Sequence, residues 1–375
     1  MRFTHATPEA TYGFAKRFSH YKDFYARHDG LIFSKLGFGT FKKEPYKEEN
    51  YTFDYKDALK MAIKNGVNVI DTAINYRYQQ SEREIGEVLE ELFKSGEVKR
   101  EELIICSKGG FVPLDFPFPQ NPYEWISEHI IQKGLATSFD IELDQHCMTP
   151  AFLNDSLERS LANLHVTCLD IYFLHNPETQ LSKIGYNHFL QKLEEIFASF
   201  EAMVREGKIK AYGLAVWNAF TYEEGNSEYI RLEDVYDVAH KVGGANHHFK
   251  YIQLPFNIAK THAYNVPNQK MSDGNYYTPL QVAHKLGLGV MSSSSLLQMH
   301  LFQKPFKPEI GYLLDSKMEL QSDVQLALQF VRSTRGIVTS LFSSSKSEHV
   351  SSNLGIATIP AINSAKYNLL YKVER

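Results

Sequence analysis

Short apolar runs alternate along this chain with longer segments of helical period, and the pattern repeats eight times. An apolar run bounded by turn residues is typical of a strand buried on both faces, and an intervening helix indicates parallel pairing. The runs lie at residues 36–41, 67–72, 103–108, 169–175, 210–216, 251–256, 289–294 and 337–343. Eight parallel strands that each lead into a helix predict an α/β fold of the (β/α)8 TIM-barrel class.

The predicted helices fill the segments between these runs. They lie at residues 53–65, 82–92, 151–164, 189–206, 232–241, 279–285 and 322–332. The helix at 151–164 is the clearest, because Thr149 suits its cap, Pro150 suits its first position, and leucines recur along one face. We expect that leucine face to pack on the barrel.

The barrel accounts for residues 31–375 as a single domain, because no low-complexity linker interrupts the pattern. Residues 1–30 form an N-terminal extension, which either covers the barrel surface or remains partly mobile. The connection at 109–149 is longer than a usual loop between strand and helix, and its Pro, Phe and Trp content predicts an ordered, lid-like insertion. A shorter excursion at 257–278 is expected to lie on the same face.

The charge balance argues against nucleic acid as a partner. A net charge of -4 and a pI near 6.4 provide no basic excess to follow a phosphate backbone, so we expect a small-molecule partner and no nucleic acid. No run reaches the roughly 18 apolar residues that a membrane helix needs, and the first residues lack a long apolar signal segment. We therefore expect a cytoplasmic protein with no membrane partner.

The cysteines and histidines lack the spacing of a disulfide framework or a metal site. Cys106, Cys147 and Cys168 are odd in number and include no CxxC pair. The pairs at 146–147 and 247–248 have no defensible ligand spacing either, so scattered side chains are the simpler interpretation. We expect no metal centre.

Three of the predicted strands end at or next to a titratable side chain. Lys108 and His175 close their runs, Asp71 is the last residue but one of its run, and Tyr76 follows five positions later. An unpaired charge at the end of a buried strand is destabilising, and the carboxyl ends of barrel strands form the active site. We therefore expect these four side chains to share one polar site.

Each of the four residues has a structural alternative. Asp71 alone is typical of a turn or a helix cap, and Tyr76 alone is typical of a half-buried packing ring. Lys108 alone suits a barrel rim, and His175 alone suits a turn. Only their joint placement at one end of a barrel favours catalysis.

Several segments together resemble the aldo-keto reductase family. They are Leu36-Gly-Phe-Gly-Thr40, Asp71-Thr-Ala-Ile-Asn-Tyr76, the strand-ending Lys108, Leu169-Asp-Ile-Tyr-Phe-Leu-His175 and Ser343-Ser-Ser-Lys-Ser-Glu-His-Val-Ser-Ser-Asn353. The resemblance spans roughly residues 33–355, and the order of the motifs is more specific than any one of them. It implies a (β/α)8 barrel with oxidoreductase activity on carbonyl compounds.

The four polar residues suit carbonyl reduction. Hydride delivery to carbon leaves negative charge on oxygen, so a nearby acid must supply a proton. Tyr76 is the candidate acid, and the Lys108 ammonium is expected to lower its pKa from about 10. Asp71 is expected to keep Lys108 charged, and His175 to orient the carbonyl or assist proton transfer.

The cofactor expected from the resemblance is NADPH. No GxGxxG motif follows a strand, but a barrel binds phosphate at the loops after its last two strands and at a helix N-terminus. The resemblance implies that Lys346 contacts the adenosine 2′-phosphate, Asn353 faces the adenine and Gln253 holds the nicotinamide carboxamide. Apart from the resemblance, Lys346 is equally typical of a solvated lysine, and Gln253 of a side chain that makes a hydrogen bond within the barrel. The expected cofactor-binding residues are Thr40, Asp71, Asn218, Gln253, Ser293, Ser294, Leu296, Ser343, Ser345, Lys346 and Asn353.

The nicotinamide half of the site departs from the family pattern. Ala215 and Val216 replace a Ser-Asn pair, and Ser293 replaces the aromatic residue that stacks on nicotinamide. Such stacking contributes about 1 kcal/mol, so its loss weakens binding. Either Asn218 and a remodelled loop compensate, or the nicotinamide is held more loosely.

Four aromatic residues are candidates for the substrate mouth, although each is more often ordinary packing: Phe41, Phe111, Trp125 and Trp217. Our primary hypothesis is an NADP-dependent reductase of an aldehyde or ketone of a small organic molecule, with Tyr76 as general acid. The lost nicotinamide contacts leave two alternatives open. One is a nucleotide-sensing or ligand-binding barrel without turnover, and the other is a redox-neutral acid/base enzyme.

Overall fold

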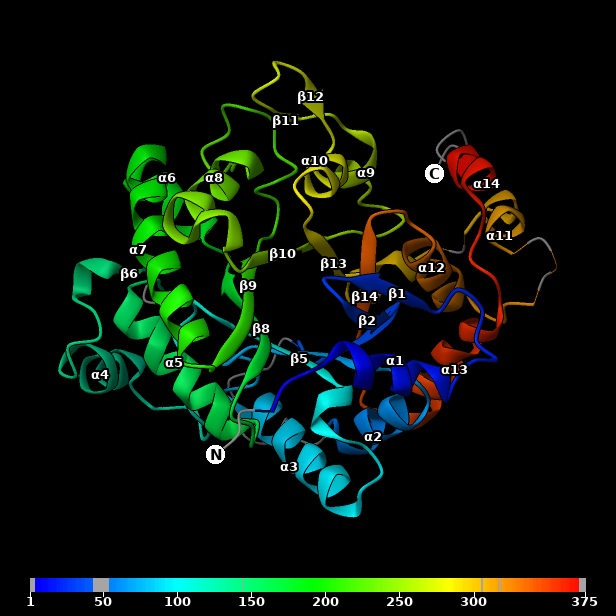
Figure 1. The fold of residues 1–375 in the computed structure, drawn as a ribbon, viewed down its shortest axis with the longest axis horizontal. Coiled ribbons are helices and arrows are strands. Elements are labelled where there is room, and N and C mark those ends of the chain that lie inside the picture. Colours follow the sequence, from blue (N-terminus) through cyan, green and yellow to red (C-terminus); the bar gives the residue numbers. More distant parts are fainter. Residues whose placement is uncertain are drawn as a thin grey trace.

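Eight parallel strands form a closed barrel in the structure, a computed structural model that describes residues 4–42, 54–143, 145–304, 306–315, 317 and 319–370. The strands run in the order expected from the sequence and are joined by helices that surround them (Figure 1). They are β3 (Leu36–Gly39), β4 (Val69–Asp71), β5 (Ile104–Gly109), β8 (Leu169–His175), β9 (Ile209–Ala215), β10 (Phe249–Pro255), β13 (Gly289–Ser293) and β14 (Ile337–Phe342). The predicted fold class is confirmed.

Helices follow the barrel strands on the outside. They are α2 (Lys56–Lys64), α3 (Gln80–Ser95), α5 (Pro150–Asn163), α7 (Tyr186–Arg205), α8 (Leu232–Gly243), α10 (Pro279–Lys285), α12 (Asp323–Arg332) and α13 (Ser347–Leu354). The Thr149 side chain accepts a hydrogen bond from the Phe152 amide at the start of α5, and Leu153 and Leu157 are buried. This confirms the predicted cap and the apolar face of that helix.

The element ends differ from the sequence prediction by a few residues. Strand β3 ends at Gly39, because the backbone after it turns into the loop that contains Thr40 and Phe41. Helix α3 continues to Ser95 and stops at Gly96, whose left-handed conformation suits a residue without a side chain. The start predicted for the first helix, at residue 53, lies outside the described residues.

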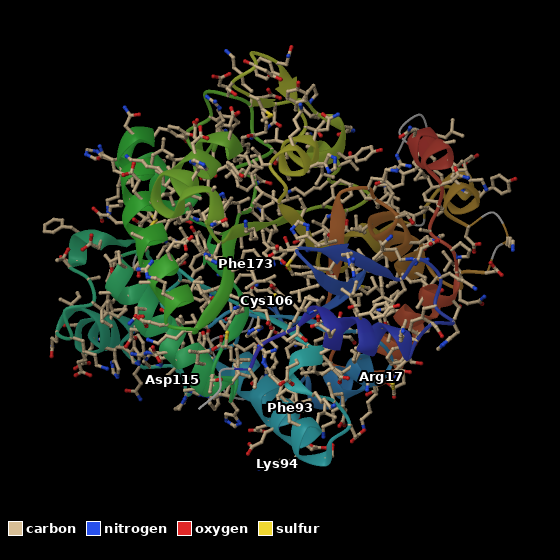
Figure 2. All side chains as sticks on the ribbon, viewed as in Figure 1. Arg17, Phe93, Lys94, Cys106, Asp115 and Phe173 are labelled. Carbon is tan, nitrogen blue, oxygen red and sulfur yellow. The ribbon has the colours of Figure 1, made fainter. Side chains whose placement is uncertain are left out.

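The N-terminal segment closes one end of the barrel. It forms α1 (Pro8–Lys16) and an antiparallel hairpin of β1 (Tyr25–His28) and β2 (Leu31–Ser34), drawn in blue across the barrel in Figure 1. Phe33 of this hairpin is fully buried in one apolar cluster with Cys106 and Phe173, which lie inside the barrel (Figure 2). Because the hairpin leads directly into β3, it lies at the N-terminal ends of the strands.

The 109–149 connection carries its own short elements, α4 (Pro122–Ile126), a π-helical turn (Ser127–Ile131), a 3₁₀ turn (Ser138–Asp140), β6 (Ile141–Glu142) and β7 (His146–Cys147). Further 3₁₀ turns lie at Arg100–Glu102, Gly244–Asn246, Leu297–Phe302 and Gly355–Thr358. The remaining elements are α6 (Glu178–Ile184), α9 (His262–Asn265), β11 (Gln269–Lys270), β12 (Tyr276–Tyr277), α11 (Pro308–Leu314) and α14 (Ser364–Leu369). Among the described helices, none is both long and apolar enough to cross a membrane.

Candidate active site

The end of the barrel opposite the hairpin carries a layer of polar and small side chains above an apolar interior. Side chains two residues apart on a strand point to the same side, so a residue two positions after an interior residue also points inward. The interior residues Val69, Cys106, Phe173, Tyr251 and Met291 are followed in this way by Asp71, Lys108, His175, Gln253 and Ser293. Ala215 follows Ala211 and Gly213 on the same side of β9, so this layer includes two of the departures, Ala215 and Ser293, whereas Val216 belongs to the outer apolar cluster.

A buried ion pair lies at the centre of this layer. Lys108 Nζ is 2.6 Å from Asp71 Oδ2 and also donates to the Thr72 carbonyl at 2.8 Å. The exposed fractions of the two residues are only 1% for Lys108 and 3% for Asp71. A buried charge pair persists when its hydrogen bonds are satisfied, and Lys108 has two such acceptors here.

Tyr76 and His175 lie against this pair. Lys108 Nζ is 5.0 Å from the centroid of the Tyr76 ring, and the Tyr76 and His175 ring centroids are 5.8 Å apart. The structure therefore brings together the four residues that the strand ends single out.

The electrostatics keep Tyr76 and His175 neutral. Burial raises the pKa of Tyr76, the Lys108 charge lowers it and the Asp71 charge raises it, with a net shift above the ordinary value. The pKa of His175 lies well below its ordinary value because of burial and the charges of Lys108 and His146. Lys108 lowers the Tyr76 pKa as expected, but burial outweighs it, so Tyr76 holds its proton firmly.

Lys108 itself remains an ammonium group. Burial alone lowers the pKa of Lys108, but the charge of Asp71, the hydrogen bond to it and the interactions with Tyr76 more than offset that effect. The net shift is upward. Asp71 therefore acts as the expected counter-ion, and a positive charge persists beside the Tyr76 ring.

A tight loop between β4 and α3 holds Tyr76 in place. Arg77, Tyr78 and Gln79 have positive φ angles of 49°, 52° and 69°, a conformation that costs a residue with a side chain about 1–3 kcal/mol. The loop is fixed by a buried salt bridge of 2.7 Å from Arg77 to Glu84 and by a 2.9 Å bond from the Gln79 amide to the Pro113 carbonyl. These contacts offset the strain and fix the Tyr76 ring.

The ends of the long insertion reach His175. His146 Nε2 donates to the His175 carbonyl at 2.7 Å, and the Phe111 ring lies 5.0 Å from the His175 ring and 5.1 Å from that of His146. His175 Nδ1 is buried without a hydrogen-bond partner among the described residues. Sequence reasoning did not place His146 in the site, because its position beside Phe111 depends on the pairing of the two ends of the insertion.

Gln253 contacts the ion pair from across the barrel. Its side-chain amide donates to Asp71 Oδ1 at 2.8 Å, while Lys108 takes the other carboxylate oxygen. This is a barrel hydrogen bond of the kind that Gln253 makes without any ligand. An amide has two N–H donors, so Asp71 occupies one of them.

The expected phosphate-binding residues lie on the loops after β13 and β14. Ser294 has a φ of 53°, and its carbonyl accepts from the Asn257 side chain at 2.9 Å, beside the half-buried Leu296. Lys346 is exposed at the N-terminus of α13, where its amide donates to Ser344 Oγ at 3.1 Å. Ser343 contacts the Tyr55 hydroxyl at 3.4 Å, Ser345 is exposed, and Asn353 is buried on α13.

Thr40, Phe41 and Trp217 lie at the same end of the barrel, whereas the contacts of Trp125 are elsewhere. Thr40 Oγ1 is 2.9 Å from Thr72 Oγ1, and the Phe41 ring lies 5.1 Å from the Tyr76 ring. Trp217 is 42% exposed after β9. The Trp125 ring instead stacks on His129 at 4.4 Å and lies 6.0 Å from the Arg159 guanidinium of α5. The structure does not bring Trp125 together with the four polar residues.

Two charged residues around Trp217 were not singled out from the sequence. Glu178 follows β8 by three positions, and its Oε1 accepts from the Trp217 amide at 2.5 Å. Lys260 follows β10, and its Nζ lies 4.7 Å from the centroid of the Trp217 ring. The only sequence signal for either residue is its position just after a predicted strand.

Burial raises the pKa of Glu178 to about 7, whereas hydrogen bonds from backbone amides lower it. Its Oε2 is buried without a partner among the described residues. The native protein therefore holds this proton more tightly than the unfolded chain does. The stability linked to it is fully present below pH 4.5 and is lost as the pH rises through about 7.

We expect Glu178→Gln to remove that pH dependence. The glutamine keeps an oxygen for the Trp217 amide but cannot ionise, so above pH 7 the variant should be more stable than the wild type by about 3 kcal/mol. Below pH 4.5 the two should be alike. Urea unfolding at both pH values measures the difference, and parallel pH profiles would count against an ionising Glu178.

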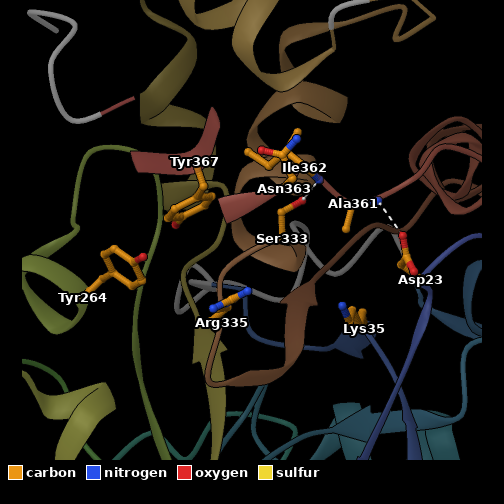
Figure 3. A pocket seen from close by; sticks show the side chains of 9 residues that line it. All are labelled: Asp23, Lys35, Tyr264, Ser333, Arg335, Ala361, Ile362, Asn363 and Tyr367. Carbon is orange, nitrogen blue, oxygen red and sulfur yellow. Dashed lines mark hydrogen bonds between the residues drawn. The ribbon is translucent and has the colours of Figure 1, made fainter. Parts of the chain in front are cut away.

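Figure 3 shows a separate hollow of about 320 Å³. Lys35, which lines it, directly precedes β3, and Arg335 lies two residues before the start of β14, so the hollow is near the N-terminal ends of the strands. Asp23, also on its wall, accepts from the Ala361 amide at 3.1 Å. The hollow is therefore distinct from the end of the barrel that holds Tyr76.

The histidines considered for a metal site make separate contacts, and the cysteines considered for a disulfide are buried. His146 contacts the His175 carbonyl, whereas the His247 ring packs against Tyr236 at 4.8 Å. The three cysteines are free and buried. Within the described ranges, no group of three His, Cys, Asp or Glu side chains could hold a metal ion.

Comparisons with known proteins point to one family. The model of the Aldo/keto reductase family matches residues 35–258. Mouse aldo-keto reductase family 1 member C13 is 29% identical over 163 residues, which is 43% of this chain and 37% of that protein. Mouse aldo-keto reductase family 1 member A1 is 27% identical over 202 residues, 51% of this chain and 49% of that protein. The chain thus covers less than half the length of these curated relatives.

Solved structures share the fold over most of both chains. An aldo-keto reductase from Klebsiella pneumoniae in complex with NADPH has a TM-score of 0.57 and 18% identity, and 94% of each chain is covered. An aldo-keto reductase from Bacillus halodurans in its holo form has a TM-score of 0.60 and 17% identity, with 95% of this chain and 97% of that chain covered.

Proposed function

Because this chain belongs to the aldo-keto reductase family, we propose that it reduces an aldehyde or ketone of a small organic molecule with NADPH. Tyr76 is the proposed general acid. The observation that carries the proposal is the buried Asp71–Lys108 ion pair, whose ammonium lies against the Tyr76 ring. This arrangement keeps a positive charge where a tyrosinate would form.

The four residues take separate roles in the proposed reaction. When bound, the nicotinamide cofactor supplies the hydride. Tyr76 transfers its proton to the carbonyl oxygen as negative charge develops there, and Lys108 stabilises the tyrosinate that remains. Asp71 holds Lys108 charged, and the neutral imidazole of His175 orients the carbonyl oxygen by a hydrogen bond.

The active end of the barrel offers more groups for the phosphates of a nicotinamide nucleotide than for its nicotinamide ring. The exposed Lys346, the start of α13 and the Ser294 loop supply cationic and N–H groups for phosphates. The second N–H of Gln253 suits the carboxamide. Ala215 and Val216 are buried and apolar, so their side chains provide no hydrogen bond for it.

The 109–149 insertion is proposed to cover the substrate as a lid. Its two ends, at Phe111 and His146, both contact His175, so its position is tied to that of the carbonyl-orienting imidazole. Phe41 and Trp217 are proposed to line the same mouth. Trp125 is proposed to stabilise the insertion on α5 rather than to touch substrate.

We expect Lys346→Met to weaken NADPH binding about tenfold, because one charge-assisted contact to a phosphate contributes roughly 1–2 kcal/mol. NADH lacks the 2′-phosphate, so its Kd should stay the same. Titrations of the intrinsic tryptophan fluorescence with each nucleotide measure both constants. Lys94→Met, on the outer face of α3, is the matched control. Equal weakening of NADPH and NADH would contradict a 2′-phosphate contact.

Binding and turnover together test the function. NADPH is added to the purified protein, and its oxidation is then followed with a panel of aldehydes and ketones. Absence of NADPH binding at high micromolar concentration would overturn the proposal. Binding without oxidation favours the second candidate, a nucleotide-sensing barrel, for which the apolar Ala215 and Val216 are the specific observation.

A further inference from the structure

Lys260 places an ammonium group at the active end of the barrel, and among the described residues it has no acidic partner. Its Nζ donates to Asn218 Oδ1 at 2.7 Å and lies 4.7 Å from the centroid of the exposed Trp217 ring. Within the described part of the chain, no carboxylate forms a salt bridge with it. The Trp217 face and the amide oxygen stabilise the cation but do not neutralise it.

The surroundings of Lys260 make that charge unusual. The side chain is half-buried, and burial alone lowers the pKa of Lys260, with no compensating acid among its described neighbours. The acid nearest along this network is Glu178, whose carboxyl binds the Trp217 amide. A half-buried cation without a counter-ion is unfavourable by itself, so an anionic ligand gains more there than at an ordinary surface lysine.

The backbone around Lys260 is held firmly. Asn257 Oδ1 accepts from the amides of Ala259 at 2.9 Å and Lys260 at 2.8 Å, and its Nδ2 donates to the Ser294 carbonyl at 2.9 Å. The turn is thus anchored beside the loop after β13, while the Lys260 side chain extends toward the loop after β9. It points away from the side of the barrel where Ser344 and Lys346 lie.

We propose that Lys260 binds the carboxylate of an acidic aldehyde or ketone, while the Trp217 ring packs against the carbon skeleton of that substrate. The assignment rests on the proposed carbonyl reduction at Tyr76. The proposed substrate is a carbonyl compound whose anionic group is separated from the carbonyl by a short carbon chain or a ring. The direction of the Lys260 side chain favours a substrate anion over a cofactor phosphate.

Paired substrates test this inference. The kcat/KM for 4-carboxybenzaldehyde is compared with that for its methyl ester, methyl 4-formylbenzoate, in the wild type and in Lys260→Met and Lys260→Arg. We expect the wild type to prefer the acid about tenfold, the advantage that one charge-assisted hydrogen bond gives, and Lys260→Met to lose that preference. Lys260→Arg should retain it, and high salt should reduce it in the wild type.

Lys285→Met is the matched control, because Lys285 also lies over an aromatic ring, 4.3 Å from the centroid of Tyr277, but before β13 at the other end of the barrel. Its acid preference should equal that of the wild type. An unchanged preference in Lys260→Met would overturn the proposal. A weaker affinity for NADPH with an unchanged preference would overturn it too, and would assign Lys260 to a cofactor phosphate.

A binding measurement separates this inference from the proposed reaction. Calorimetric titration with benzoate and with benzamide needs no hydride transfer. Binding of benzoate that Lys260→Met abolishes, with benzamide binding weakly to both proteins, supports the anion site even if no aldehyde is reduced. Equal binding of benzoate and benzamide to the wild type would overturn the anion site, whereas absent aldehyde turnover alone overturns only the reductase.

Discussion

Tyr76→Phe is expected to lower kcat/KM for carbonyl reduction by about 10²–10⁴-fold, the usual contribution of a positioned proton donor. The substitution removes only the hydroxyl. The ring contacts at 5.1 Å with Phe41 and 5.8 Å with His175 do not depend on it, so the fold and the affinity for NADPH should remain unchanged. Steady-state oxidation of NADPH and fluorescence titration measure the two quantities.

Tyr172→Phe is the matched control for this loss. Its hydroxyl is also buried, but it donates to the Leu153 carbonyl at 3.1 Å, between β8 and α5. Removing it should lower stability slightly and leave kcat/KM near that of the wild type. Undiminished turnover in Tyr76→Phe would refute the proposed acid, and a comparable loss in both variants would indicate general damage to the barrel.

Lys108→Met is expected to have the second largest effect, on stability as well as activity. It leaves the Asp71 carboxylate, 3% exposed, without its cation. Removing one partner of a buried pair typically lowers the free energy of unfolding by about 3–5 kcal/mol. Turnover should also fall by at least about a hundredfold, because the charge that stabilises the tyrosinate is gone.

The double variant Asp71→Asn with Lys108→Met separates the two effects. It no longer buries a charge, and the asparagine that replaces the aspartate still has an oxygen for the Gln253 amide. The midpoint of urea unfolding should therefore recover much of the loss, while activity should stay low. If the double variant unfolds as early as Lys108→Met, the pair does not stabilise the barrel through its charges.

The barrel and the core of the site were predictable because both depend on position along the strands. The apolar runs identify the strands, and barrel closure brings the carboxyl ends of all of them together. Asp71, Lys108 and His175 therefore lie close together whatever path the following loops take. Tyr76 was predictable because only a short loop separates it from Asp71, although the three left-handed residues after it carry no glycine to announce them.

The rest of the site depends on loop paths that a strand pattern does not specify. Gln253 lies on a strand and was expected either to hold the carboxamide or to make a barrel hydrogen bond; its contact with Asp71 is of the second kind and joins strands that are not neighbours in the barrel order. His146 reaches His175 only because the two ends of a long insertion pair. Glu178 and Lys260 have ordinary surroundings in the sequence, and only the folded loops bring both to Trp217.

The contact of Gln253 with Asp71 provides a physical route for coupling between nucleotide binding and the ion pair. One of its two N–H donors is taken by Asp71, so a ligand bound to the other shares a rigid amide plane with the ion pair. Coupling between two binding events is reciprocal. If nucleotide binding changes the hydrogen bond from Gln253 to Asp71, it changes the proton affinity of Lys108 and Tyr76 by some factor. Protonation of these groups must then change the affinity for the nucleotide by that same factor. Cofactor affinity would then vary with pH through a glutamine that never ionises.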